Sequence, residues 1–166
     1  LGNEDLVAAT CRSDGDDILE EVLEATEASM VAEITEADCW ARCRHSEDWP
    51  DGLLDGADAP RCLIGRGDSI RLGEVSTAGS VTVVGARRAT SYGLEMARSI
   101  SHELSAAGLL VVSGMALGID GAAHRGALEA GPTVAVLGCG VDRPYPVSHT
   151  RLYRDIVENG MVVSEF

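Results

Sequence analysis

The stretch LLVVSGMALGIDGAAHRGALEAGPTVAVL, residues 109–137, decides the fold of this chain. It opens with the apolar run Leu109–Ser113, passes through a small-residue loop into a helical segment closed by Gly131, and ends with a second apolar run, Thr133–Leu137. Short apolar runs without polar alternation are typical of strands buried on both faces of a parallel sheet. A strand, a helix and a second strand joined by short connections predict an α/β fold.

The same alternation continues on both sides of this stretch. Upstream, the run Val81–Val84 predicts a buried strand, and a helix is expected from about Leu94 to Ala107, with Gly108 as its left-handed C-terminal cap. The apolar stripe of that helix is expected to comprise Met96, Ala97, Ile100, Leu104 and Ala107. Asp120 is expected to cap the helix that follows residues 109–113.

Downstream of residue 137, one further helix and one further strand are expected. Ser148 is expected to cap the helix, Gly160 to end it, and Met161–Ser164 to form the strand. The inward positions of that helix are predicted to be Leu152, Ile156 and Val157. The whole pattern predicts a Rossmann-like doubly wound parallel sheet over residues 49–166.

The first part of the chain has a different character. Residues 1–80 hold 6 arginines against 19 carboxylates, whereas residues 81–166 hold 7 arginines against 8, and the chain has no lysine. Residues 1–48 therefore form an acidic region of their own, in which Asp16–Ile34 has helical spacing. Pro60–Gly67 is expected to be a short strand that leads into a turn. A net charge of −14 opposes long-range attraction to a polyanion, but the nearly neutral second half leaves room for a local arginine patch.

The cysteines and the chain start favour a reduced intracellular protein. Five cysteines form no regular framework, and the start LGNEDLVAAT has neither the basic nor the apolar region of a secretory signal. Cys39, Cys43 and His45 lack the spacing of a zinc knuckle and an obvious fourth ligand, so no metal is expected. No stretch approaches the ~18 consecutive apolar residues of a membrane span, and a cytoplasmic location is expected.

The loops that follow the strands are the expected ligand site, because open parallel sheets bind ligands beyond the carboxyl ends of their strands. These loops are Gly85–Gly93, Ser113–Gly118, Gly138–Pro146 and Ser164–Phe166. In the first loop, Gly85 allows a tight turn, Gly93 allows close approach near the helix start, and the guanidinium of Arg87 suits a phosphate. Arg88 points either to this site or to solvent.

The third loop carries Arg143 beside Tyr145, a pair suited to holding a phosphate while stacking on a base, although a tyrosine packed on the sheet edge is an almost equal alternative. Asp120 is expected to cap the helix, and contact with a ligand is the alternative. His124 is expected to be structural. The G-x-G-x-x-G spacing of dinucleotide sites and the Walker lysine are both absent. Since Ser91, Ser113 and Ser164 lie in no nucleophile elbow, the site is expected to bind rather than to catalyse.

Three motifs resemble the DNA-processing protein A family, also called Smf. They are VVGARRATSYG at 83–93, VVSGMALGIDGAAHRGAL at 111–128, and TVAVLGCGVDRPYP at 133–146, followed by VVSEF at 162–166. These segments are similar to the family's G-[SA]-R loop, its S-G-x-A-x-G-I-D segment and its G-x-D-x-x-Y-P turn. The three motifs occur in the family's order and span about half the chain, and 49–67 resembles the family's lead-in more loosely.

The resemblance implies a protein that binds single-stranded DNA during natural transformation, protects it, and passes it to the RecA recombinase. It further implies a homodimer without catalytic activity, cofactor or membrane contact. The DNA- or phosphate-binding residues expected on this basis are Gly85, Arg87, Tyr92, Gly93, Ser113, Gly114, Gly118, Arg143 and Tyr145. Two alternatives stay open: a Rossmann-like protein or phosphoribohydrolase-like enzyme that takes a free nucleotide derivative, and a chain that acts only as an interaction partner.

Overall fold

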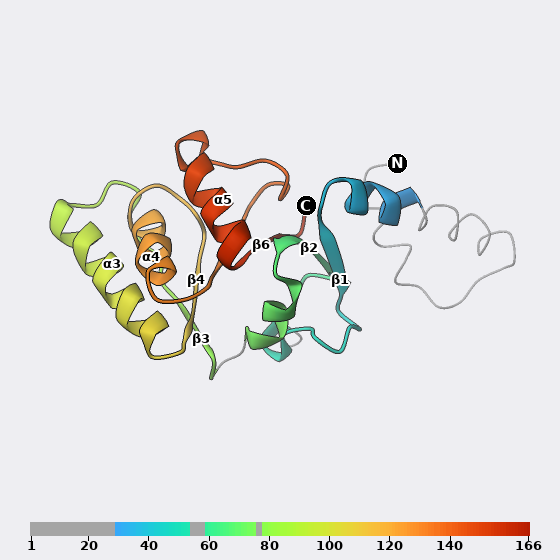
Figure 1. Cartoon of the computed structure of the whole chain (residues 1–166), viewed down its shortest axis with the longest axis horizontal. Helices are drawn as coiled ribbons and strands as arrows, with labels where there is room; N and C mark the ends of the chain where they lie inside the picture. The colour runs from blue at the N-terminus through green and yellow to red at the C-terminus, as the bar shows by residue number, and fades with distance from the viewer. Residues whose placement is uncertain (1–28, 54–58, 76–77) are drawn as a thin grey trace, which may run out of the picture.

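The described residues form one six-stranded mixed sheet with helices packed against it (Figure 1). The computed structural model describes residues 29–53, 59–75 and 78–166. Within them the strand order is β1-β2-β6-β5-β4-β3. The strands are β1 (Trp40–Cys43), β2 (Cys62–Gly67), β3 (Ser80–Thr82), β4 (Leu110–Ser113), β5 (Thr133–Val136) and β6 (Met161–Ser164).

The predicted α/β class and the parallel arrangement of the motif-bearing strands are confirmed. Strands β3, β4, β5 and β6 pair in parallel, and β1 and β2 extend the sheet with antiparallel pairing that the sequence pattern did not predict. The helices between the parallel strands are α3 (Ser91–Ala106), α4 (Ile119–Leu128) and α5 (Thr150–Asn159). Short 3-10 helices in the described ranges are η1 (Asp51–Leu53), η2 (Ser69–Glu74) and η3 (Val147–His149), and residues 29–36 are also helical.

Alternate residues of the buried strands point into two separate cores, one on each face of the sheet. Ala135 and Val162 belong to a cluster with Ile156 of α5, on the face that the helices cover. The intervening positions, among them Val134, belong to a cluster with Leu72 of η2. The second cluster also contains Trp49, Leu63, Leu110, Met161 and Val163. Burial of the sheet on both faces explains why its strands are continuous apolar runs.

Two predictions about the first parallel unit are wrong. The strand β3 ends at Thr82, and Val84, expected to be buried, is 64% exposed. Since β3 is the edge strand of the described sheet, Val84 lacks a second neighbour on its outer side. In α3 the buried positions are Ala97, Ser101 and Ser105, whereas Met96 and Ile100, expected on the buried stripe, are 37% and 48% exposed.

Small residues take the buried positions of α3 because α3 and α4 lie very close together. A Cβ atom added at Gly126 of α4 would lie 2.0 Å from the carbonyl oxygen of Arg98 in α3. Contacts between these two helices leave no room for the large apolar side chains that the stripe assumed.

The predicted helix ends are partly correct. Gly108 has φ +85° directly after α3, and Gly160 ends α5 by donating its N–H to Ile156, so both predicted stops are confirmed. The start of α3 was placed three residues too late, because Thr90 caps it by accepting from the N–H of Gly93 at 3.1 Å. The Ser148 cap is wrong: Ser148 lies inside η3, and α5 begins without a side-chain cap.

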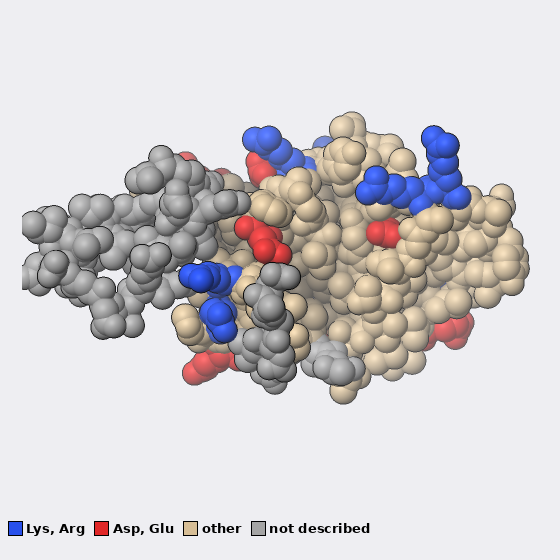
Figure 2. Space-filling model, turned by 180° about the vertical axis from the view of Figure 1, so that it is seen from behind, with Lys and Arg blue, Asp and Glu red and all other residues tan. Residues whose placement is uncertain are grey.

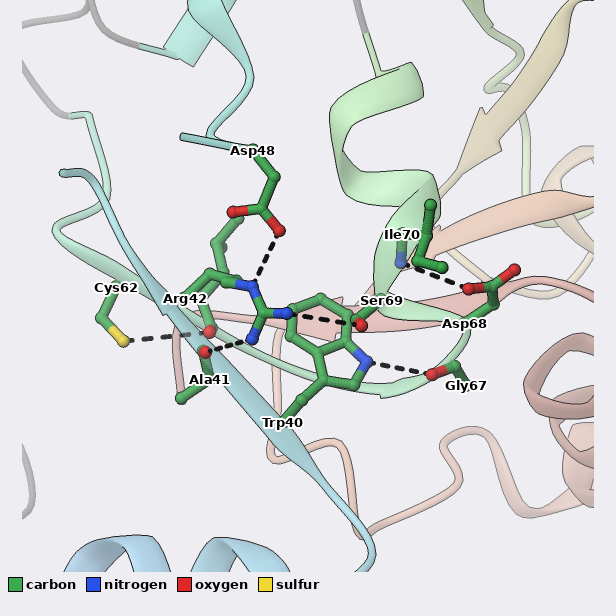
Figure 3. Close-up of polar contacts among 10 residues, drawn as sticks. Trp40, Ala41, Arg42, Asp48, Cys62, Gly67, Asp68, Ser69 and Ile70 are labelled. Carbon is green, nitrogen blue, oxygen red and sulfur yellow. Dashed lines mark hydrogen bonds and ion pairs between the residues drawn. The ribbon is translucent and has the colours of Figure 1, made fainter. Parts of the chain in front are cut away.

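The side chains of Trp40 and Arg42 bond strand β1 to neighbouring segments of the chain (Figure 3). The indole N–H of Trp40 donates to the carbonyl of Gly67 at 3.1 Å, and Arg42 pairs with Asp48 at 2.8 Å. The Arg42 guanidinium also lies 5.8 Å from the centre of the Trp40 ring. Strand β1 thus comes from the stretch before residue 49, where the sequence placed the start of the domain, whereas Pro60–Gly67 forms the expected strand as β2.

Most of the expected acidic helix Asp16–Ile34 falls outside the described residues. In the part of the chain that the structure describes, no group of three or more His, Cys, Asp or Glu side chains gathers as metal ligands would. None of the helices in those residues has the length and apolar character that crossing a membrane requires.

Candidate nucleic-acid interface

A crevice of about 440 Å³ lies at the carboxyl ends of the parallel strands. The loops after β3, β4 and β5 each contribute to it, as the topology predicted. Its lining residues are Arg87 from the first loop, Gly114, Ala116 and Leu117 from the second, and Leu137, Gly138, Cys139, Tyr145 and Pro146 from the third. In Figure 1 these loops lie along the upper side of the molecule.

The buried carboxylate of Asp120 holds the first two loops together. Asp120 is 5% exposed, and its two oxygens accept the N–H of Gly85 at 3.3 Å and the N–H of Gly114 at 3.2 Å. The prediction that Asp120 caps α4 is wrong, because the N-cap is Gly118 and no side chain caps this helix. Asp120 lies in the first turn of α4, where the helix dipole favours its charge, and its task is to join two loops.

The first two loops also contact each other through their backbones. Gly118 has φ +84°, and a Cβ atom there would lie 2.2 Å from the carbonyl oxygen of Ala86. The N–H of Ile119 donates to the same carbonyl at 3.3 Å. Only glycine permits both the left-handed backbone and this close approach.

The third loop is fixed by side chains from the segment that follows it. His149, 5% exposed, donates its Nδ1–H to the carbonyl of Met115 in the second loop at 3.0 Å. Tyr153 of α5 donates its hydroxyl to the carbonyl of Val141. Burial raises the pKa of Tyr153, and the guanidinium of Arg66, which lowers it, has the smaller effect. The phenol therefore keeps its proton for this bond at neutral pH. The crevice is therefore bounded by three loops that are bonded to each other or to α5.

His124 is a structural residue, as the sequence suggested. It is fully buried, and its Nδ1–H donates to Thr133 Oγ1 at 2.8 Å, while that hydroxyl donates to the carbonyl of Val111 at 2.7 Å. Burial lowers the pKa of His124 to about 4, so the ring is neutral at physiological pH. It links α4 to β4 and β5 beneath the crevice.

The structure brings only part of the predicted residue set into the crevice wall. Arg87, Gly114 and Tyr145 line it. Ser113 is 2% exposed and donates its hydroxyl to the carbonyl of Val83 at 2.6 Å, and Gly85 is bonded to Asp120. The remaining predicted residues, which do not line the crevice, are Tyr92, Gly93, Gly118 and Arg143. Arg143 is exposed and lies 3.7 Å from Asp142.

The lining residues not predicted are mostly apolar. Leu117, Leu137 and Pro146 form walls, and Gly138 and Cys139 form part of the third loop. Except for Leu137, all of them lie in the loops that follow the strands. Their position in these loops is the one feature of the sequence that indicates a place in the site. Charge and motif membership indicate polar contact residues and give no signal for an apolar wall.

Apolar and cationic groups stand together at this end of the molecule. Leu117 is 46% exposed, Tyr145 68% and Val147 79%, and both Arg87 and Arg88 are exposed. Figure 2 shows the face behind the helices: arginines project from the upper edge of its described part, while other arginines and several carboxylates lie elsewhere on it. An arginine beside an exposed aromatic ring suits a ligand that has both a phosphate and a flat apolar surface.

The parallel strands with helices between them place the chain among Rossmann-like α/β proteins, and the crevice lies at the carboxyl edge of the parallel strands, where such folds commonly hold their ligands. Comparison with known families specifies it further. The profile of the DNA recombination-mediator protein A family matches residues 40–166. The chain belongs to this family.

Relatives from several bacteria share the matched region. The putative DNA processing protein DprA of Mycobacterium tuberculosis H37Rv is 46% identical over 97 residues, which are 58% of this chain and 25% of that protein. Protein Smf of Escherichia coli K12 is 38% identical over 123 residues, 73% of this chain and 32% of that protein. The chain thus corresponds to about a quarter to a third of these two relatives.

Two solved structures are similar in fold. DNA processing protein A from Streptococcus pneumoniae superposes with a TM-score of 0.71 at 28% identity, covering 97% of this chain and 56% of that one. DNA processing protein A from Helicobacter pylori, whose structure concerns its single-stranded DNA binding mode, gives a TM-score of 0.67 at 30% identity. That match covers 77% of this chain and 55% of the Helicobacter chain.

Proposed function

We propose that this chain binds single-stranded DNA in the strand-end crevice. The observation that carries the proposal is the composition of the crevice wall: the guanidinium of Arg87, the exposed ring of Tyr145 and the apolar side chains of Leu117 and Pro146 border one space of about 440 Å³. A single strand offers both partners at once, since its phosphate pairs with an arginine and its unpaired base stacks on a ring. In a duplex the base faces are already stacked and are not free to enter the crevice.

The rest of the wall suits the same ligand. Gly114 and Gly138 expose backbone where no side chain intervenes, and nothing lies within 4 Å of a Cβ added at Gly138. Loops bonded through Asp120 and His149 hold this surface in place before a ligand arrives. A preformed site loses less conformational entropy on binding.

The test is a titration of labelled oligonucleotides and free nucleotides, monitored by fluorescence anisotropy and by competition. The native chain is expected to prefer a single strand to its duplex and to bind mononucleotides far more weakly. Tyr145→Ala is expected to weaken binding by roughly 1–3 kcal/mol, about 5- to 150-fold, because one stacked base is lost. Tyr145→Phe keeps the ring and is expected to retain most of the affinity.

Equal loss in the Ala and Phe variants of Tyr145 would contradict stacking, and tighter binding of a mononucleotide than of the oligonucleotide would favour the nucleotide-derivative alternative. Salt supplies a second readout, since the logarithm of the affinity for single strands falls with log salt by ~0.7 per neutralised phosphate.

We further propose that the chain acts on DNA by binding alone, without catalysis. The hydroxyl of Ser113 is buried and engaged with Val83, and the ring of His124 is buried, neutral and bonded to Thr133, so neither supplies an accessible nucleophile or base. Incubation of labelled single strands and mononucleotides with the chain is expected to leave them unchanged. A product band that persists after further purification and disappears in Arg87→Ala would contradict this proposal.

The cellular role is proposed from the family. We propose that the chain works in the cytoplasm as a homodimer during DNA uptake and recombination, where it protects single strands and helps to load the RecA recombinase. Nuclease digestion of a bound strand, light scattering for the mass, and the lag of RecA filament formation on that strand test the three parts. Unchanged digestion would contradict protection of the strand, and a monomer mass would contradict the homodimer. An unchanged lag would contradict a role in loading RecA.

A further inference from the structure

A second groove lies on the helical layer, outside the crevice. It has a volume of about 740 Å³ and is bordered by α3, α4, η3 and α5. Three arginines line it, one from each long helix: Arg98, Arg125 and Arg151. Figure 1 shows α4 between α3 and α5, the arrangement that the helix contacts also give, so these residues converge from three separate segments.

Two of the three arginines are unengaged. Arg98 pairs with Glu129 at the end of α4, with its Nε 2.7 Å from the carboxylate, so these two charges offset each other. Arg125 and Arg151 are exposed, and within the part of the chain that the structure describes neither has an ion pair or a side-chain hydrogen bond. Asp155 is the remaining carboxylate of the groove wall. Two unengaged guanidinium groups against one carboxylate leave the groove cationic on a chain of net charge −14.

The groove adjoins the proposed DNA crevice. Tyr145 and Pro146 line the crevice, while Ser148, two residues further on, lines the groove. Between them stands Val147, 79% exposed, at the start of η3. Consecutive Cα atoms are 3.8 Å apart, so Pro146 and Ser148 are separated by at most ~8 Å. A strand that leaves the crevice beside Tyr145 therefore reaches the groove by crossing this one turn.

We propose that Arg125 and Arg151 form a second phosphate-binding site, which holds the backbone of nucleotides that extend beyond the crevice. This inference rests on the proposed function and adds the path of the strand: bases are held in the crevice, and the backbone then crosses Val147 onto the helical layer. Arginine guanidinium groups suit phosphate oxygens because their planar donor set matches phosphate geometry. The exposed apolar side chain of Val147 offers contact to a base at the crossing.

The proposal predicts that the contribution of the groove depends on strand length. A strand of about 4 nucleotides, near the lower limit of single-strand site sizes, fills the crevice alone, whereas one of about 12 reaches the groove. Each single-strand phosphate contact contributes ~0.7 to the log–log salt slope, so loss of two contacts lowers the slope by about 1.4. Taking equal affinities at ~1 M salt, this corresponds to a loss of about 14-fold at 0.15 M and about 70-fold at 0.05 M.

The experiment compares the native chain with the double variant Arg125→Ala/Arg151→Ala, using both strand lengths at several salt concentrations. The matched control is Arg61→Ala/Arg154→Ala, which removes two exposed arginines that line neither cavity and leaves the same net charge. This control separates a local contact from the change in overall repulsion. The groove variant is expected to lose affinity and salt slope for the 12-nucleotide strand only, and the control to bind both strands as the native chain does.

The outcomes separate this inference from the function on which it rests. If the native chain binds both strands and the groove variant binds the longer one with native affinity and slope, the path is wrong and crevice binding stands. Equal losses in the groove variant and the control would also overturn the path, because net charge would then be the cause. Absence of binding by the native chain to either strand would overturn both proposals.

Discussion

Substitution of Asp120 by alanine is expected to destabilise the folded protein, because it removes the carboxylate that joins two loops of the crevice. In the native protein one buried carboxylate accepts the N–H of Gly85 at 3.3 Å and that of Gly114 at 3.2 Å, joining the loops after β3 and β4. Hydrogen bonds to a charged group contribute about 1.5–3 kcal/mol each. Gly85 and Gly114 are both exposed, so water can bond to their N–H groups after the substitution. We therefore take the lower limit for each bond and expect the free energy of unfolding to fall by about 3 kcal/mol.

Urea unfolding followed by circular dichroism measures this loss. The matched control is Asp142→Ala, which removes a carboxylate that is 59% exposed in the neighbouring loop and is expected to change stability by less than about 0.5 kcal/mol. An unchanged m-value in both variants establishes that the same fold is unfolding. A loss below about 1 kcal/mol for Asp120→Ala, or an equal loss in the control, would refute the claim that this carboxylate joins the loops.

Because the pKa of His124 is about 4 in the folded chain and about 6.5 in an unfolded one, the folded state favours the neutral ring, so stability present above pH 6.5 is lost as the pH falls. Because the unfolded ring is already half protonated at pH 6.5, the loss between pH 6.5 and 5 is about 1.6 kcal/mol. Urea unfolding of His124→Gln over this range is expected to lack that share, and equal pH dependence in both proteins would contradict it. Gly118→Ala is expected to lower the free energy of unfolding by at least about 2 kcal/mol, because the added Cβ would lie 2.2 Å from the carbonyl oxygen of Ala86 on a left-handed backbone. The control Gly138→Ala, whose Cβ would have nothing within 4 Å, is expected to lower it by less than about 1 kcal/mol. Similar melting temperatures for the two variants would argue against the close loop contact. Arg88→Ala, adjacent to the crevice arginine but outside the wall, is expected to reduce single-strand affinity less than Arg87→Ala, and the reverse order in an anisotropy titration would move the phosphate contact to Arg88.

The sequence predicted the parallel part of the fold because its strands are short apolar runs and its helices have clear glycine stops, such as Gly108 and Gly160. It missed β1, since WARC has no alternation and becomes a strand through pairing with β2 and the bond from Trp40 to Gly67. It also misjudged α3, where the close approach of Gly126 to Arg98 selects small buried residues over an apolar stripe. Close packing between elements distant in sequence leaves no periodic signal.

The candidate site was predicted at the level of loops and less well at the level of residues. The rule that ligands bind at the carboxyl ends of parallel strands selected the correct edge. Asp120 was assigned to its own helix because its position fitted a cap, whereas its partners are 35 and 6 residues earlier in the chain. In a sequence, an apolar residue such as Leu117 or Pro146 is normally expected to pack in the interior. Only the folded arrangement of the loops shows that these two side chains border an open crevice.

The central claim, that the crevice binds single-stranded DNA through Arg87, has a direct test. Fluorescence anisotropy of a labelled ~30-nucleotide single strand and its duplex is measured with the native chain, Arg87→Ala and the charge-matched Arg154→Ala. We predict salt-sensitive binding that prefers the single strand, is largely lost in Arg87→Ala and is retained in Arg154→Ala. Failure of the native chain to bind at low salt, or equal binding by all three proteins, would contradict the account.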